Sequence, residues 1–407
     1  MREELTDHHC YLEAACAGQR AGGLYTANLA TVLGASAAFG FSLATFYLLP
    51  KYLKGELGAD ASEIGVVTGV FGAAVAAGAP LAGAWVDRVQ RRLLITFGAL
   101  VMAATSLAFL LVDSLGPAII VLRAIQGVAF AGVFTAVGAL VTDLAPEERL
   151  SEALGLSGAS MLVMSAVAPP VVEPLARAGG WSAVFCVAAA TALLGALLSL
   201  AVHERAGRRH LRAGGEVGLW ALLKKRHTIH YAIVTAAAGA AFGVMFTFQQ
   251  PFVMELGRDD VGGFFVAYAI VAIVVRLVFG SLPDRLGRFR VAVFSLNLYT
   301  VTVLSMAVLT PVWLELVGAL LGLAHGVFFP AFNAAALARV DAGDRGKLLS
   351  VFTGAFYGGL AAGVFVLGVV ADVAGYPPVF VLTAALTCCG GVLLLFSPEL
   401  GGADTRG

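Results

Sequence analysis

Long apolar runs limit what this chain can fold into. Runs of roughly 20 residues fill most of the sequence, and they match the ~30 Å hydrocarbon core of a bilayer at ~1.5 Å rise per helical residue. They are apolar on all sides, whereas a transmembrane β-strand alternates polar and apolar residues over ~10 positions. With 59% hydrophobic and 13% charged residues, the composition lies far outside that of soluble domains. We therefore predict an all-α integral membrane protein.

Twelve transmembrane helices are expected, in two six-helix halves. The spans are predicted near residues 27–49, 62–83, 93–112, 116–141, 152–176 and 181–202, then 229–254, 262–282, 290–310, 313–338, 347–371 and 376–397. The predicted organisation is an N-terminal tail (1–26), an N-terminal half (27–202), a linker (203–228), a C-terminal half (229–398) and a C-terminal tail (399–407). Residues 1–26 lack the basic-then-apolar order of a signal peptide, so we expect the first span to be retained.

The basic residues predict the orientation in the membrane. Loops after even-numbered spans and the linker carry seventeen Lys and Arg, while the opposite loops carry only Lys51, Lys54, Arg177 and Arg258. This asymmetry places both termini and the linker in the cytoplasm. We expect a monomeric multi-pass protein of the inner (cell) membrane. Its basic linker suits anionic lipid rather than nucleic acid.

One charged cluster occurs after the second span of each half. The first copy reads Gly83-Ala-Trp-Val-Asp87-Arg88-Val-Gln-Arg91 and the second Gly280-Ser-Leu-Pro-Asp284-Arg285-Leu-Gly-Arg288, 197 residues later. Asp143 and Asp341, Gly127 and Gly326, and Gly180-Trp181 and Gly375-Tyr376 repeat at similar offsets. Such a parallel repeat predicts pseudo-symmetric halves related by an axis along the membrane normal, with the substrate path between them. The alternative is ordinary topogenic charge, which two copies in register make less favourable.

The cluster resembles the loop between the second and third spans of the major facilitator superfamily, approximately Gly-x-x-x-Asp-Arg-x-Gly-Arg-Arg. Gln90 replaces the glycine in the first copy, and Phe289 replaces the last basic residue in the second. The resemblance implies a cytoplasmic latch that breaks and reforms as the protein alternates between outward-facing and inward-facing states. The latch residues would be Gly83, Asp87, Arg88, Arg91, Arg92, Gly280, Asp284, Arg285, Gly287 and Arg288.

The fourth span carries a second match. Arg123-Ala-Ile-Gln126-Gly127 resembles the family's Arg-x-x-Gln-Gly motif, which is associated with proton transfer in proton-coupled members. A charge ~12 Å from the outer end of a span costs ~2.5 to 3.5 kcal/mol. Arg123 should therefore face a cavity or a partner, with snorkelling as the alternative.

The fifth span departs from the family's drug/proton exporters. Those proteins carry a Gly-Pro-x-x-Gly-Gly pattern, while Ala168-Pro169-Pro170-Val-Val-Glu173-Pro174 keeps the proline break without the closing glycines. Export and import therefore both stay open.

Proton coupling requires a group that changes charge within a cavity. Glu173 could pair with Arg123 on the adjacent helix or lie in interfacial water. His325, near the middle of the tenth span, could carry a proton or be a neutral histidine bonded to a neighbouring backbone. Arg276 is interpreted as structural, near the cytoplasmic face. The candidate coupling residues are Arg123, Gln126, Gly127, Glu173 and His325.

Aromatic and amide side chains dominate the expected substrate cavity. Its candidate lining residues are Asn28, Thr31, Phe246, Gln249, Gln250, Asn333 and Tyr357. Few charges among them favour amphipathic or neutral organic substrates over phosphates, which would require clustered Arg and Lys.

The leading functional hypothesis is a secondary active transporter, a proton-coupled exporter of small organic molecules by alternating access. The sequence has no Gly-x-x-x-x-Gly-Lys-Ser/Thr loop, so ATP is not the direct energy source. It also has no metal or nucleophile spacing that indicates an enzyme, and no cofactor is expected. One alternative is a facilitator or proton symporter that imports sugars or organic acids. Another is a transporter-like receptor or scaffold without flux, which a substantial domain outside the membrane would support.

Overall fold

The computed structural model describes residues 26–86, 88–146, 149–204, 226–278, 285–337 and 345–396. Within these ranges the chain is almost entirely helical and contains no β-strand. Lipid offers no hydrogen-bond partner to a backbone, so an apolar chain in the bilayer satisfies its N–H and C=O groups internally. The predicted all-α class is confirmed.

The N-terminal half consists of α2 (Ala27–Thr45) continued by η1 (Phe46–Leu48) and α3 (Leu49–Gly55), then α4 (Ala61–Val86), α5 (Arg91–Ala108) with η2 (Phe109–Leu111), α6 (Pro117–Leu144) and α7 (Leu150–Leu200). The C-terminal half consists of α9 (Arg226–Glu255), α10 (Gly262–Val278), α12 (Arg288–Met306), η4 (Pro311–Trp313), α13 (Leu314–Leu337), α14 (Arg345–Ala374) and α15 (Tyr376–Leu395).

Two glycines turn the chain at equivalent places in the halves. Gly180 divides the 51-residue α7 into two spans at φ 71°, and Gly375 precedes α15 at φ 79°. Only glycine adopts such left-handed angles at little cost. Of the helices in the described ranges, ten are long and apolar enough to cross a membrane. Counting α7 as two spans and adding the 17-residue α10 accounts for the twelve predicted spans.

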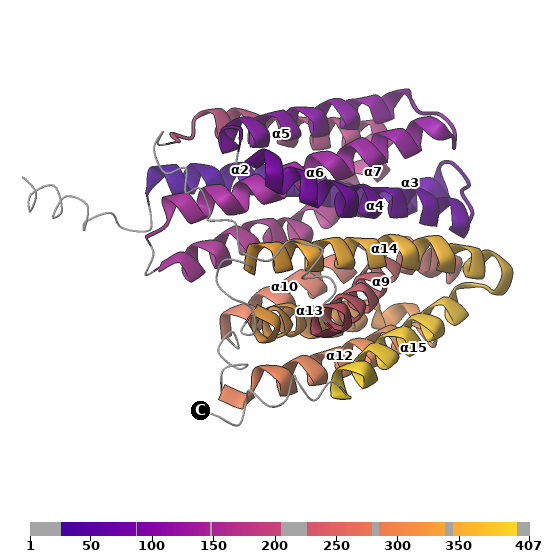
Figure 1. Ribbon diagram of the computed structural model, residues 1–407. Helices are drawn as coiled ribbons and strands as arrows, with labels where there is room; N and C mark the ends of the chain where they lie inside the picture. Colours follow the sequence, from indigo (N-terminus) through magenta and orange to yellow (C-terminus); the bar gives the residue numbers. More distant parts are fainter. Residues whose placement is uncertain are drawn as a thin grey trace, which may run out of the picture.

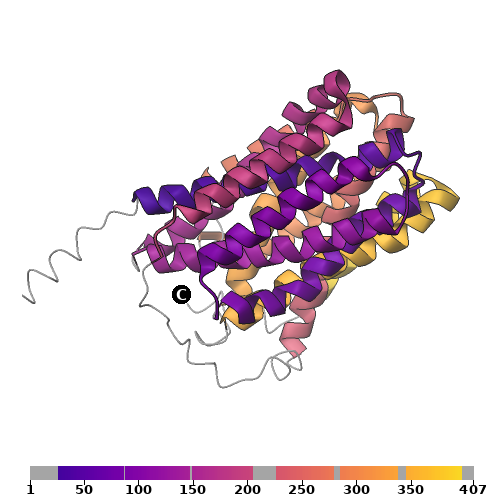
Figure 2. The ribbon, with the colours of Figure 1, turned by 90° about the horizontal axis from the view of Figure 1, so that it is seen from above.

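The halves form two groups of helices that lie against each other. Figure 1 shows α2 to α7 above α9 to α15, and in the turned view of Figure 2 the first group covers the second. Across the boundary, α4 packs along α14 and α7 packs along α10. The six-plus-six arrangement is the one predicted from the repeat.

The helix ends define two faces that differ in charge. The basic face, at the left of Figure 1, carries the ends of helices at Arg91, Arg149, Arg288 and Lys347. The acidic face, at the right, carries the end of α9 at Glu255, the end of α14 near Asp372 and the turn of α7 at Gly180, which Glu173 precedes. Lys51 of α3 pairs with Glu173 there.

The halves pack more tightly toward the acidic face. A Cβ placed on Gly65 of α4 would lie 2.3 Å from the carbonyl oxygen of Val364 in α14, and one on Gly368 would lie 2.7 Å from that of Ala61. Such contacts admit only glycine. Near the basic face, a Cβ on Gly155 or Gly158 of α7 would meet nothing within 4 Å. The two groups of helices therefore touch at one end and separate toward the other.

Candidate functional site

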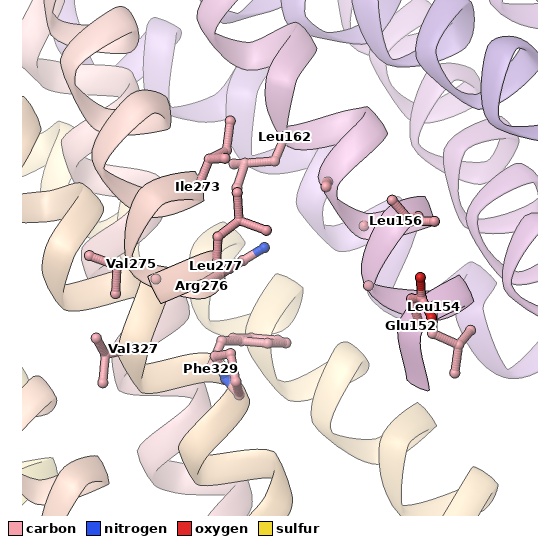
Figure 3. Close-up of a pocket in the computed structure, with 15 residues that line it drawn as sticks. Glu152, Leu154, Leu156, Leu162, Ile273, Val275, Arg276, Leu277, Val327 and Phe329 are labelled. Atoms are coloured by element: carbon pink, nitrogen blue, oxygen red, sulfur yellow. The ribbon is translucent and has the colours of Figure 1, made fainter. Parts of the chain in front are cut away.

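A cavity of about 500 Å³, which we call the main cavity, lies between the two halves toward the basic face. The basic ends of α7 and α10 and the middle of α13 form its walls. Most of the lining is apolar, and Figure 3 shows Leu162, Ile273 and Phe329 around it, with Arg276 and Glu152 on opposite sides. Arg149 binds the Glu152 carboxylate through two hydrogen bonds of 2.8 Å. The cavity is thus a mainly apolar space with one arginine in its wall.

At the acidic face, Glu173 joins the two halves. Its side chain is only 2% exposed, and it accepts hydrogen bonds from the backbone N–H groups of Val261 (3.1 Å) and Gly262 (2.8 Å) at the start of α10. Lys51 donates to the same carboxylate at 2.5 Å and also to the carbonyl oxygen of Asp259. A carboxylate at a helix N-terminus satisfies N–H groups that have no partner within the helix.

Asp372 makes the corresponding contact in the opposite direction. From the end of α14 it accepts hydrogen bonds from the N–H groups of Ala61 (2.7 Å) and Ser62 (3.0 Å) at the start of α4. Glu173 and Asp372 are 199 residues apart, within two residues of the spacing of the charged clusters. Each half therefore supplies one carboxylate and receives the other at a helix N-terminus. We call Glu173, Asp372 and the helix ends that they cap the carboxylate seal.

Further hydrogen bonds between the halves lie at the same end. Gln250 donates to the carbonyl oxygen of Tyr47 at 2.6 Å, and Lys54 binds Glu255 at 3.1 Å. These hydrogen bonds and those of the carboxylate seal join the halves toward the acidic face. The conformation is therefore closed at the acidic face and has its main cavity toward the basic face.

Arg123 lies in a small enclosed space between these two regions. Its side chain is 5% exposed, donates to the Gln126 side-chain oxygen at 2.7 Å and lies over the ring of Phe71 at 4.5 Å. A pocket of about 80 Å³ beside it is lined by residues of both halves, among them Phe242 and Phe246. The guanidinium Nε and the Gln126 amide nitrogen have no partner among the described residues. Gly127 permits close packing, because a Cβ there would lie 2.5 Å from the carbonyl oxygen of Phe71.

His325 lies in an aromatic cluster between Arg123 and the main cavity. Its ring centroid is 5.0 Å from that of Phe242 and 5.8 Å from that of Phe329, and the Tyr299 hydroxyl is 3.4 Å from its Nδ1. Phe242 also lines the pocket of Arg123, and Phe329 lines the main cavity. Phe242 and Phe329 thus place aromatic side chains on either side of His325, one at the pocket of Arg123 and one at the main cavity. Glu173, in contrast, pairs with Lys51 rather than with Arg123.

The first copy of the predicted latch makes contacts within the N-terminal half. Arg91 forms an ion pair with Asp143, and the backbone N–H groups of Arg91 and Arg92 donate to Glu204 at 3.2 and 3.4 Å. Arg88 and Arg285 are exposed. Gly83 lies in α4, and Arg288 is the first residue of α12. Asp87, Gly280, Asp284 and Asp341 lie outside the described residues, as do most residues of the predicted tails and linker.

The two copies of the cluster differ in backbone conformation where the family has its glycine. Gly287 has φ 93°, which favours glycine, while Gln90 has φ −60° and ψ 127°, which any residue adopts. The departure of the first copy from the family pattern therefore has a local conformational reason.

Only some of the predicted cavity residues line a pocket. Phe246 and Tyr357 border the pocket of Arg123, and Gln249 is fully buried with neither amide atom bonded to a described residue. Gln250 instead bonds across the halves. The remaining three lie elsewhere: Asn28 bonds to the backbone of His203 at 2.8 and 2.9 Å, Thr31 bonds to its own helix, and Asn333 is half-buried on α13.

Sequence reasoning missed Lys51 and Asp372 as contacts between the halves and Arg276 as a wall of the cavity. For Asp372 a signal existed, because the offset that relates the two clusters also relates it to Glu173. For Arg276 the signal was the arginine itself in an otherwise apolar helix, which was interpreted as structural because it lies near the end of the span.

Comparison with known proteins agrees with this architecture. The sequence model of the Major Facilitator Superfamily matches residues 30–312 and 231–405. An uncharacterized MFS-type transporter, YhhS of Escherichia coli K12, is 28% identical over 159 residues, 38% of this chain and 39% of the relative. Multidrug resistance protein 2 of Bacillus subtilis is 25% identical over 259 residues, 60% of this chain and 63% of the relative. The chain thus covers less than two thirds of the length of these relatives.

Solved structures share the fold at low sequence identity. The nucleoside transporter NupG aligns with a TM-score of 0.73 and 15% identity, over 91% of this chain and 98% of that one. A POT family transporter in complex with 5-aminolevulinic acid aligns with a TM-score of 0.76 and 13% identity, over 93% and 98% of the two chains. With twelve spans in two pseudo-symmetric halves and a family match along most of its length, the chain belongs to the major facilitator superfamily.

Proposed function

We propose that this secondary transporter is a proton-coupled exporter of small organic molecules that works by alternating access. The observation that carries the proposal is the opposition of its two ends: a cavity of about 500 Å³ toward the basic face and the carboxylate seal at the acidic face. A transporter of this kind exposes one site alternately to each side of the membrane. The seal and the cavity are the features expected of one of the two states.

The proposed orientation places the basic face in the cytoplasm of the inner membrane, as the distribution of Lys and Arg predicts. The described state then faces inward, and its cavity is ready to receive a substrate from the cytoplasm. Membrane lipid and the substrate are the proposed partners of a monomeric protein.

The outward-facing state requires the carboxylate seal to open. Glu173 would leave the start of α10, and Asp372 would leave the start of α4. At the basic face the latch residues would then close the cavity. The Arg91 and Asp143 ion pair lies within one half, so it can be retained while the halves move.

Proton coupling is assigned to Arg123, which lines the pocket between the halves, and to His325, which packs against Phe242 of the same pocket. Gln126 holds the Arg123 guanidinium at 2.7 Å, which positions the charge without neutralising it. His325 packs against Phe242, which lines the enclosed pocket, and against Phe329, which lines the main cavity. Glu173, assigned to coupling from the sequence, has its proposed role at the seal, because Lys51 and two backbone N–H groups already bind its carboxylate.

Export is favoured over import by one comparison, the relative named multidrug resistance protein 2. The alternative is a facilitator or proton symporter that imports sugars or organic acids. A receptor or scaffold without flux would not need both a closed end and an open end.

The test uses inverted membrane vesicles that contain the full chain and a panel of chemically varied organic compounds. We expect accumulation of a subset of these compounds when the vesicle interior is acidic, and its loss when a protonophore collapses the pH gradient. Accumulation that survives the collapse would overturn proton-driven export. Flux only in the opposite direction would support the importer, and no flux of any compound would support the receptor.

A further inference from the structure

Arg276 gives the main cavity a positive charge that no identified ion pair within the described ranges neutralises. It extends from α10 into the wall of the cavity (Figure 3), and its buried Nε has no hydrogen-bond partner there. A charged side chain in a transmembrane segment normally pairs with an opposite charge or faces a functional cavity. We propose that this cavity binds amphipathic organic anions, with the Arg276 guanidinium as the anchor for their carboxylate or sulfonate group.

Four carboxylates in the described part of the chain are already engaged by other groups. Glu173 and Asp372 accept backbone N–H groups at the carboxylate seal, and Glu315 pairs with Arg258 at the acidic face. Asp143 pairs with Arg91. None of these four described carboxylates is available to neutralise Arg276, which leaves its charge open to a bound anion.

Among the described residues that line the cavity, Glu152 is the one carboxylate. It lies across the cavity from Arg276, and Arg149 binds both of its oxygens at 2.8 Å. That pair is about 40% exposed, and solvent therefore screens its charges more strongly than the charge of Arg276. The negative charge of Glu152 is thus partnered at the rim, while the positive charge of Arg276 faces the interior.

The walls define the rest of the ligand. Leu156, Leu162, Ile273, Val327 and Phe329 surround the space, and Gly155 and Gly158 leave the α7 side without a Cβ. An arginine binds a planar oxyanion through two parallel hydrogen bonds, and the apolar walls accommodate an apolar or aromatic body. The expected ligand is a molecule with one anionic group and a ring system that fits about 500 Å³.

This inference names the substrate class of the proposed transporter and so rests on that function, but its test measures binding without flux. Detergent-purified full-length protein is titrated with 2-naphthoate and with the neutral 2-naphthamide, which share ring system and size. Isothermal titration calorimetry gives the two affinities. Failure of proton-driven export in vesicles would leave the measured affinities unaffected. Failure of anion binding would likewise leave the result of the export assay unaffected.

We expect 2-naphthoate to bind wild-type protein at least tenfold more tightly than 2-naphthamide. Arg276→Gln should weaken 2-naphthoate binding roughly 10- to 100-fold, as for loss of a charge-assisted bidentate contact, and leave 2-naphthamide binding within about twofold. Arg276→Lys, which retains the charge but not the planar fork, should give an intermediate affinity.

Arg290→Gln is the matched control, because Arg290 is an exposed arginine near the basic start of α12 and outside the cavity lining. It should leave both affinities unchanged. Three results would overturn the proposal: equal affinity of wild-type protein for the two probes, an equal loss of both probes in Arg276→Gln, or an effect of Arg290→Gln as large as that of Arg276→Gln. An equal loss of both probes would mean that Arg276 maintains the shape of the cavity and does not bind the anion.

Discussion

Removing the charge of Glu173 should open the acidic face. In the described state its carboxylate accepts two backbone N–H groups of the opposite half, at 2.8 and 3.1 Å, and is 2% exposed. Glu173→Gln keeps the shape of the side chain and leaves an amide oxygen that can accept one of these bonds. Hydrogen bonds to charged groups contribute ~1.5 to 3 kcal/mol against ~0.5 to 1.5 kcal/mol for neutral ones. The interaction with the helix N-terminus is also lost.

The loss of a contact shifts the equilibrium between the open and closed acidic face only if the contact exists in one of these states and not in the other. The bond between Lys51 and Glu173 lies within the N-terminal half, so it contributes to both states. The two bonds from the N–H groups at the start of α10 to Glu173 contribute only to the closed state. We therefore expect Glu173→Gln to destabilise the closed acidic face by about 1 to 2 kcal/mol, which corresponds to roughly a 5- to 30-fold rise in the population ratio of open to closed molecules.

The assay is a distance distribution between two spin labels at the acidic face. Leu111 at the end of η2 and Val308 after α12 are 84% and 82% exposed and belong to different halves, so labels at Leu111→Cys and Val308→Cys in a cysteine-free background should not disturb packing. Pulsed electron paramagnetic resonance should show a longer-distance population that grows in Glu173→Gln. Glu255→Gln is the matched control, since its pair with Lys54 also joins the halves but is 49% and 31% exposed. Exposed pairs contribute only ~0 to 1 kcal/mol.

Identical distributions in wild-type protein and Glu173→Gln would refute the reasoning. So would a shift in Glu255→Gln as large as that in Glu173→Gln, because burial would then not determine the strength of the contact.

Three further predictions follow from the same structure. Asp372→Asn should shift the same spin-label distances in the same direction as Glu173→Gln. The two effects on the free energy of opening should add, because the two carboxylates cap different helices. A double variant that is no more open than either single variant would argue against separate contacts. Gly65→Ala should also open the acidic face or lower the melting temperature, since its Cβ would lie 2.3 Å from a carbonyl oxygen, whereas Gly83→Ala, with nothing within 4 Å, should do neither. Arg123→Ala should abolish pH-driven accumulation in vesicles while the protein remains folded by circular dichroism, and normal accumulation would remove Arg123 from the coupling path.

The sequence predicted the spans well because hydropathy and charge are local properties. Gly180 and Gly375 marked repeated turns that the backbone angles confirm. The structural setting of Arg123, inside a pocket formed by both halves, also followed from the cost of a charge at that depth. These features depend on a residue and the membrane around it, and they need no knowledge of how helices pack.

Contacts between the halves were harder to predict. Whether Glu173 meets Arg123, water or the start of α10 depends on the relative position of two groups of helices, which no local pattern specifies. For the same reason, no local pattern predicted that α7 and α13 would form a cavity around Arg276 of α10. The replacement of a glycine by Gln90 became explicable only from its φ angle.

The reciprocal contacts of Glu173 and Asp372 have a consequence for the symmetry of the chain. A contact in which each unit offers the same group and receives it at the same place is the isologous contact of a symmetric dimer. Each six-helix half carries everything needed to associate with a copy of itself: an acidic end on one helix and open N–H groups on another. The chain thus has the form of a symmetric dimer joined into one polypeptide, in which the two equivalent carboxylates are a glutamate and an aspartate.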